Sequence, residues 1–173
     1  ALDAVERSLI RNYHNHKARQ LKTSLLRKTD RVDEAVKWAE DSLAIDAFNA
    51  ACLFELYLLK NDASLLDELK KLLQGNPHSY IEYALDFAVG GLYEEAERFL
   101  SLAVPSSGEA YPMVFYTLGW LASRQGKEKE AGDYFHRAAR MSPGKCFPNR
   151  IEEVIILQAA IRSNPEDARA PYF

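Results

Sequence analysis

The chain has 173 residues, with 22 Lys+Arg against 25 Asp+Glu, a formal net charge of -3 and 47% hydrophobic residues. This composition excludes a disordered or collagen-like chain, and the length suits one compact domain or one short repeat array. The acidic balance gives no reason to expect nucleic acid, and no apolar run approaches the roughly 20 residues that a membrane helix needs. We therefore expect a partner that is neither nucleic acid nor membrane.

The N-terminal part of the chain lacks the two residues that most strongly break helices. It contains no Gly or Pro before Gly75, so no residue there interrupts a helix through its backbone chemistry. No stretch of the chain alternates apolar and polar residues with β-branched enrichment, so we expect no strands. The apolar spacing predicts a partial unit over 1–14, a helical hairpin over 15–47 and a more degenerate, Leu-rich hairpin over 48–77.

The opening residues repeat a pattern that returns 34 residues later. Glu6 and Ser8 correspond to Glu40 and Ser42 at this spacing. A fixed period of this length is typical of proteins built from stacked repeats, in which each unit contacts only its neighbours.

Two further hairpins are predicted over 78–108 and 112–145. In the second, apolar and small residues recur at i, i+3, i+4 and i+7 on two helices joined by the turn "RQGKEKE": Phe115, Leu118, Gly119, Ala122, Ala131, Phe135 and Ala138. Small residues allow two helices to approach closely, so we expect Gly119 and Ala131 to face each other. Pro143 ends the second helix, because proline cannot continue the hydrogen-bond ladder.

This pattern resembles the tetratricopeptide repeat (TPR) family, whose 34-residue unit has aromatic, Leu-Gly, Ala, aromatic, Ala and Pro residues at fixed offsets. The resemblance implies an all-α fold, an α-α superhelix of stacked TPR-like hairpins with about ten helices in a single array. An extra helix over 149–163 and the start of a further repeat over 166–173 follow the last hairpin. Both ends interrupt the period, and the chain does not begin with Met. We therefore interpret the chain as a piece of a larger bacterial TPR-containing protein.

No cluster of residues indicates catalysis or metal binding. His14 and His16 lie two residues apart in a predicted turn without a nearby third ligand. Cys52 and Cys146 are far apart in apolar settings, which favours two buried free thiols and fits a reducing compartment. We expect a cytoplasmic protein that is not an enzyme, with no catalytic residues, no metal site and no cofactor.

In the TPR family the first helices of successive repeats line a concave surface, which implies a non-catalytic scaffold for protein–protein interaction. The implied partner is a protein or peptide, or another domain of the parent chain. The contact residues that the resemblance implies are basic, aromatic or apolar: Lys17, Arg27, Phe54, Tyr57, His78, Ile81, Tyr116 and Trp120. The alternative is that a tightly wound short array buries these rings against neighbouring helices.

The family's carboxylate clamp, which grips a peptide's C-terminal carboxylate, is not expected here. It needs Asn at the sixth repeat position, which in this chain holds other residues: Leu21, Ala51, Glu82 and Thr117. Residues 11–31 carry seven basic residues and one acid, Asp30. This stretch favours either an acidic partner or a solvated helix face balanced by acids elsewhere.

A competing interpretation places the chain in a larger enzyme. Its sequence pattern resembles that of helical arrays in large bacterial proteins that also carry a carbohydrate-associated β-rich domain. In this interpretation the chain is an accessory helical-repeat region of such an enzyme.

The predicted C-terminal helix has an unusual apolar content. Residues 151–162 hold too many apolar residues for one buried stripe. We therefore expect weak self-association through an apolar C-terminal surface, caused by interruption of the array.

Overall fold

The computed structural model describes residues 1–105, 110–144 and 146–173, which contain ten α-helices and no strand. The predicted all-α class with about ten helices is therefore confirmed for these residues. The helices form two compact units, Ala1–Gly75 (unit 1) and Asn76–Phe173 (unit 2). The predicted repeat boundaries at 108 and 145 lie outside the described residues.

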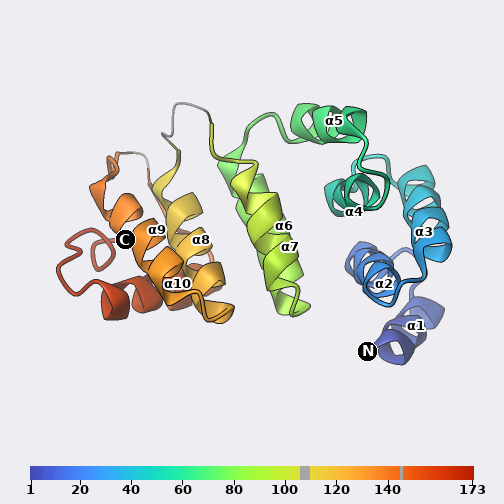
Figure 1. Ribbon diagram of the computed structural model, residues 1–173, viewed down its shortest axis with the longest axis horizontal. Coiled ribbons are helices and arrows are strands. Elements are labelled where there is room, and N and C mark those ends of the chain that lie inside the picture. The colour runs from blue at the N-terminus through green and yellow to red at the C-terminus, as the bar shows by residue number, and fades with distance from the viewer. Residues whose placement is uncertain (106–109, 145) are drawn as a thin grey trace. The chain divides into compact units, whose positions relative to one another are not determined.

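Unit 1 contains five helices that pack in sequence order (Figure 1). The helices are α1 (Leu2–Arg11), α2 (His16–Lys28), α3 (Val32–Ile45), α4 (Ala50–Lys60) and α5 (Ala63–Leu73). Each helix packs against the next, and α2 also packs against α4. The first helices of two neighbouring hairpins therefore lie side by side, as the repeat interpretation requires.

Two asparagines 34 residues apart begin the first helices of unit 1. The Asn15 side chain accepts a 3.1 Å hydrogen bond from the backbone N–H of Ala18, and Asn49 accepts one of 3.1 Å from Cys52. Each bond satisfies a backbone donor that has no partner within the helix. The 34-residue spacing in the sequence therefore returns in the caps of these two helices.

Unit 2 contains the remaining five helices. They are α6 (Pro77–Val89), α7 (Tyr93–Ser101), α8 (Pro112–Arg124), α9 (Glu128–Arg140) and α10 (Ile151–Ser163). The pairs α6–α7 and α8–α9 form hairpins, and α7 packs against α8 (Figure 1). The last helix, α10, packs against both α8 and α9.

The α8–α9 hairpin depends on a close approach at Gly119. A Cβ atom at this position would lie 2.6 Å from Cδ1 of Phe135, which is closer than real Cβ contacts. The three atoms nearest this Cβ all belong to Phe135, so the closest approach to Gly119 is made by this ring and not by Ala131. Ala131, one helical turn before Phe135 on α9, is buried as well. The missing side chain at Gly119 accommodates a ring rather than a second small residue.

Candidate partner-binding site

The first helices of the hairpins are α2 and α4 in unit 1 and α6 and α8 in unit 2. We call the side of these helices that carries the predicted contact residues the first-helix face. In unit 1 this face contains a buried carboxylate that the sequence did not indicate. Glu55 of α4 is fully buried, and its Oε2 accepts a 2.7 Å hydrogen bond from Nε of Arg27 on α2. The hydroxyl of Ser24 donates a second bond of 2.7 Å to Oε1 of Glu55. A buried charge requires such partners. Arg27, which the sequence predicted as a partner contact, is thus also part of the α2–α4 packing.

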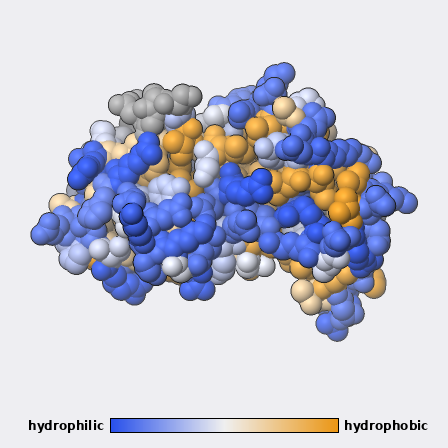
Figure 2. Space-filling view, viewed as in Figure 1, coloured by the Kyte–Doolittle hydropathy of each residue, from blue (hydrophilic) through white to orange (hydrophobic). Residues whose placement is uncertain are grey.

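The aromatic residues of α4 differ in accessibility. Phe54 is 1% exposed, so its prediction as a contact residue was wrong. Tyr57 is half-buried and packs on Phe54 with ring centroids 6.1 Å apart. Lys17 of α2 is exposed. Figure 2 shows hydrophobic residues gathered over α4 among largely hydrophilic ones. Within unit 1, Lys17, Arg27 and Tyr57 remain accessible to a partner.

The basic stretch 11–31 is partly balanced by acids within unit 1. The Lys22 ammonium lies 3.2 Å from a carboxylate oxygen of Glu6, and the Arg31 guanidinium lies 2.7 Å from Glu34. Together with the bond between Arg27 and the buried carboxylate of α4, these pairs support a helix face balanced by acids from other segments. The pairs are less consistent with a surface reserved for an acidic partner.

Arg19 lies in the same stretch but is completely buried. Its guanidinium carbon is 4.7 Å from the ring centroid of Tyr13 and 4.5 Å from that of Trp38. Nε donates a 2.9 Å hydrogen bond to the hydroxyl of Ser42. Two ring faces and a hydroxyl thus surround the cation. Arg19 packs in the core of unit 1 and presents no charge to a partner.

Two of the contact residues predicted on unit 2 are also buried. Ile81 and Tyr116 are both 0% exposed, so these predictions were wrong. The Tyr116 hydroxyl donates a 2.7 Å hydrogen bond to the carboxylate of Asp167, and the Phe173 ring lies 6.3 Å from the Tyr116 ring. Burial and the bond to Asp167 raise the pKa of the Tyr116 hydroxyl. The segment after α10 therefore covers Tyr116.

His78 begins the first-helix face of unit 2. It is half-buried, and its ring lies 4.7 Å from the ring of Tyr111. The Tyr111 hydroxyl accepts a 3.2 Å hydrogen bond from the backbone N–H of Phe147. Burial is the main cause that raises the pKa of Tyr111, which stays neutral at physiological pH. His78 is thus a partly accessible ring that packs on Tyr111, and a hydrogen bond to the backbone holds Tyr111 in place.

Trp120, also predicted from the sequence, lies in a partly exposed group of three side chains. Its ring meets the ring of Tyr93 edge-on, with centroids 6.2 Å apart. The Arg124 guanidinium carbon lies 5.4 Å from the Tyr93 centroid, and Nη2 donates a 3.3 Å bond to the Tyr93 hydroxyl. Trp120 and Tyr93 are partly exposed and Arg124 is exposed. We call these three residues the Trp120 cluster.

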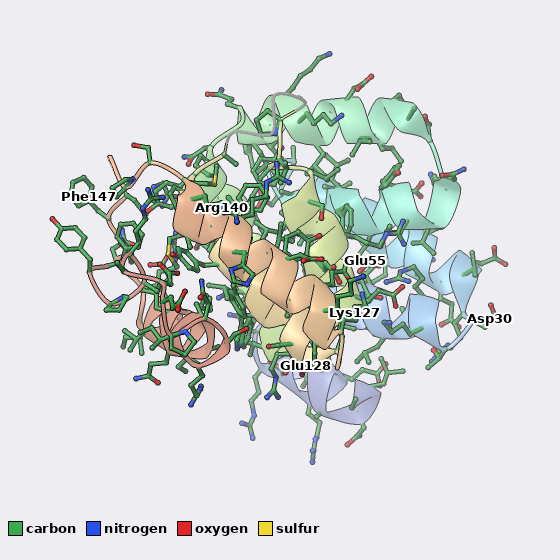
Figure 3. All side chains as sticks on the ribbon, turned by 60° about the vertical axis from the view of Figure 1, so that its left-hand side comes forward. Asp30, Glu55, Lys127, Glu128, Arg140 and Phe147 are labelled. Atoms are coloured by element: carbon green, nitrogen blue, oxygen red, sulfur yellow. The ribbon has the colours of Figure 1, made fainter. Side chains whose placement is uncertain are left out.

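A polar network adjoins the Trp120 cluster. The amide of Gln125 donates a 2.7 Å hydrogen bond to Oε2 of Glu97, which also accepts a 2.9 Å bond from the Lys127 ammonium. The bond to Glu97 raises the pKa of Lys127. Figure 3 shows Lys127 beside Glu128 at one end of α9. Rings bordered by satisfied polar groups are the usual composition of a protein interface.

Tyr93 and Arg124 were missed by the sequence reasoning. Tyr93 is the first residue of a second helix, and Arg124 is the last residue of a first helix. Neither residue is among the contact residues that the family resemblance implied. Tyr93 meets Trp120 because α7 packs against α8, and Arg124 joins the group through its contact with Tyr93. The positions within a single repeat do not describe this packing between helices.

The described residues contain no group of three or more His, Cys, Asp or Glu side chains that could hold a metal ion. None of the helices in the described ranges is long and apolar enough to cross a membrane. Both cysteines are buried free thiols, as predicted.

No family model and no curated protein sequence matches the chain. Several solved TPR structures are similar to it. The thermophilic TPR protein TTC0263 from Thermus thermophilus is 17% identical over 99% of this chain and 89% of that chain, with a TM-score of 0.45. The MamA protein is 18% identical over 91% of this chain and 87% of its own, with a TM-score of 0.41.

A third similar structure is YrrB, a TPR protein described as having an unusual peptide-binding site. It is 16% identical over 99% of this chain and 98% of its own, with a TM-score of 0.37. At these identities and TM-scores, the three similarities support no inference about a ligand or a partner of this chain. The TPR-like fold of this chain follows from its own helical hairpins and from the packing of α2 against α4.

Proposed function

We propose that the chain is a non-catalytic scaffold that binds a protein or peptide segment, with the Trp120 cluster as a principal contact. The observation that carries this proposal is the partly exposed Trp, Tyr and Arg group on unit 2. These three residue types are the most enriched among residues that dominate interface energetics. Their mutual contacts hold the side chains in place before binding, which reduces the entropy lost when a partner is bound.

Four other accessible side chains are proposed as additional contacts. Lys17, Arg27 and Tyr57 belong to the first-helix face of unit 1, and His78 belongs to that of unit 2. An apolar side chain of the partner would pack against the exposed edge of Trp120, and polar groups of the same segment would meet Arg124. A separate protein and another domain of the same parent chain would both supply such a segment.

The proposal is tested by selecting a peptide from a displayed random library against the whole chain and measuring its affinity by calorimetry. Trp120→Ala should weaken binding by about 2 kcal/mol or more, because truncating a central aromatic contact removes its buried area. Phe147→Ala is the control, since Phe147 is a 76% exposed ring of unit 2 outside the cluster. We expect the control to bind as the parent does.

Two results would contradict the proposal. Equal affinity of Trp120→Ala and the parent would remove the Trp120 cluster from the site. A library that yields no specific binder at all would argue against a peptide-binding scaffold.

A further inference from the structure

The outer face of α10 is an exposed apolar stripe. Ile151 is 83% exposed, Val154 54% and Ile155 51%. At 3.6 residues per turn, Ile151, Ile155 and Arg162 lie nearly on one line along the helix, with Val154 beside it. The opposite face holds the buried residues that pack into unit 2: Glu153, Ile156, Leu157 and Ala160. We call the exposed residues Ile151, Val154, Ile155, Gln158 and Arg162 the α10 stripe.

Opposite charges mark the two ends of this helix. Glu152 lies in the first turn and Arg162 in the last turn, and both are exposed. Within the described part of the chain neither forms an ion pair. Each favours its own helix terminus through the helix dipole. The two residues are ten positions apart, about 15 Å along the helix, so they cannot pair with each other in one copy.

An antiparallel arrangement of two copies would satisfy both charges at once. A two-fold axis near the middle of α10 places Glu152 of each copy beside Arg162 of the partner subunit. Ile155 then lies near the axis, and the aliphatic stem of the arginine covers Ile151. Such an interface is isologous, because the same stripe is presented by both copies and each contact occurs twice.

We propose that the α10 stripe is a self-association surface, which pairs two copies of this chain antiparallel through Glu152 and Arg162. This surface is distinct from the Trp120 cluster, so the proposal does not depend on the proposed function. One helix face is small compared with the roughly 800 Å² per partner of a stable interface, so the dimer is weak. Its affinity should depend on salt, because the flanking charges are exposed.

Analytical ultracentrifugation from about 10 μM to about 1 mM covers the range in which a weak dimer dissociates. We expect the sedimentation coefficient of the parent to rise with concentration. Ile155→Lys should remain monomeric, because it introduces a charge near the axis. The matched control is Ile10→Lys on α1, where the parent residue is 84% exposed and outside the stripe. This variant should associate as the parent does.

A charge exchange tests the antiparallel geometry. Glu152→Arg and Arg162→Glu should each weaken the dimer about tenfold or more, and the double variant should restore it. Circular dichroism of each variant checks that α10 remains folded. The proposal would be overturned by a parent that stays monomeric throughout, by a dimer that persists in Ile155→Lys, or by single exchanges that the double variant fails to rescue.

Discussion

Arg27 on α2 donates a 2.7 Å hydrogen bond from Nε to Oε2 of Glu55 on α4, and the Glu55 side chain is fully buried. The two residues are 28 positions apart, and the helices that carry them are the first helices of two successive hairpins. The bond therefore joins these two hairpins. The same carboxylate holds Ser24 through its hydroxyl. A residue that the sequence suggested for partner binding therefore also stabilises the packing of two repeats.

Replacing Glu55 by glutamine tests this packing. Glu55→Gln should lower the free energy of unfolding by about 1–3 kcal/mol, because Arg27 loses its charged acceptor in a buried setting. The control is Glu40→Gln, which removes the exposed pair with Lys60 and should cost less than about 1 kcal/mol. Urea unfolding of the three proteins measures the difference. Equal losses in the two variants would contradict the role of Glu55.

Adding a methyl group at Gly119 tests the close approach within the α8–α9 hairpin. Gly119→Ala should destabilise the protein by about 1–3 kcal/mol, since its Cβ would overlap the Phe135 ring. Gly132→Ala is the matched control on α9, where a Cβ meets nothing within 4 Å. This control should stabilise the helix by up to about 1 kcal/mol. If Gly119→Ala unfolds at the same midpoint temperature as the parent protein, the α8–α9 hairpin does not have the close approach described here.

The thiol of Cys52 should be unreactive in the native protein. Burial raises the pKa of Cys52 to about 12, so almost no thiolate forms at pH 8. In the unfolded chain the pKa of this thiol is about 8.5, so the unfolded state loses the proton at a lower pH than the folded state does. The contribution of Cys52 to the free energy of unfolding therefore falls as the pH rises from about 8.5 toward 12. A Cys146→Ser variant leaves Cys52 as the single thiol for labelling with a disulfide reagent. Rapid labelling at pH 8 without denaturant would contradict this prediction.

The hairpins could be predicted from the sequence because their signals are local. Gly119 and Phe135 occupy regular offsets in two adjacent helices, and Asn15 and Asn49 show the 34-residue period. The identity of the residue opposite Gly119 was not predictable at this level. Two small residues and one ring all fall on the facing sides, and only the packed side chains determine which of them fills the gap.

The accessibility of the contact residues depends on segments that are distant in the sequence. Tyr116 is covered through a hydrogen bond to Asp167, which lies 51 residues later. Glu55 meets Arg27 only because α2 packs against α4. A repeat position specifies which side of a helix a residue occupies. It does not specify which remote segment packs over that side, and this is why the sequence assigned Tyr116 and Trp120 to the same surface.

The most direct test of the scaffold proposal uses Trp120 as its own reporter. The chain has two tryptophans, so Trp38→Phe leaves Trp120 as the single one. Titration with the library-selected peptide should shift the emission of Trp120 to shorter wavelength as the ring loses solvent, with the same Kd as calorimetry gives. The matched Trp120→Phe variant, in which Trp38 reports from unit 1, should show no such shift. Tight binding by calorimetry with unchanged Trp120 emission would contradict the account.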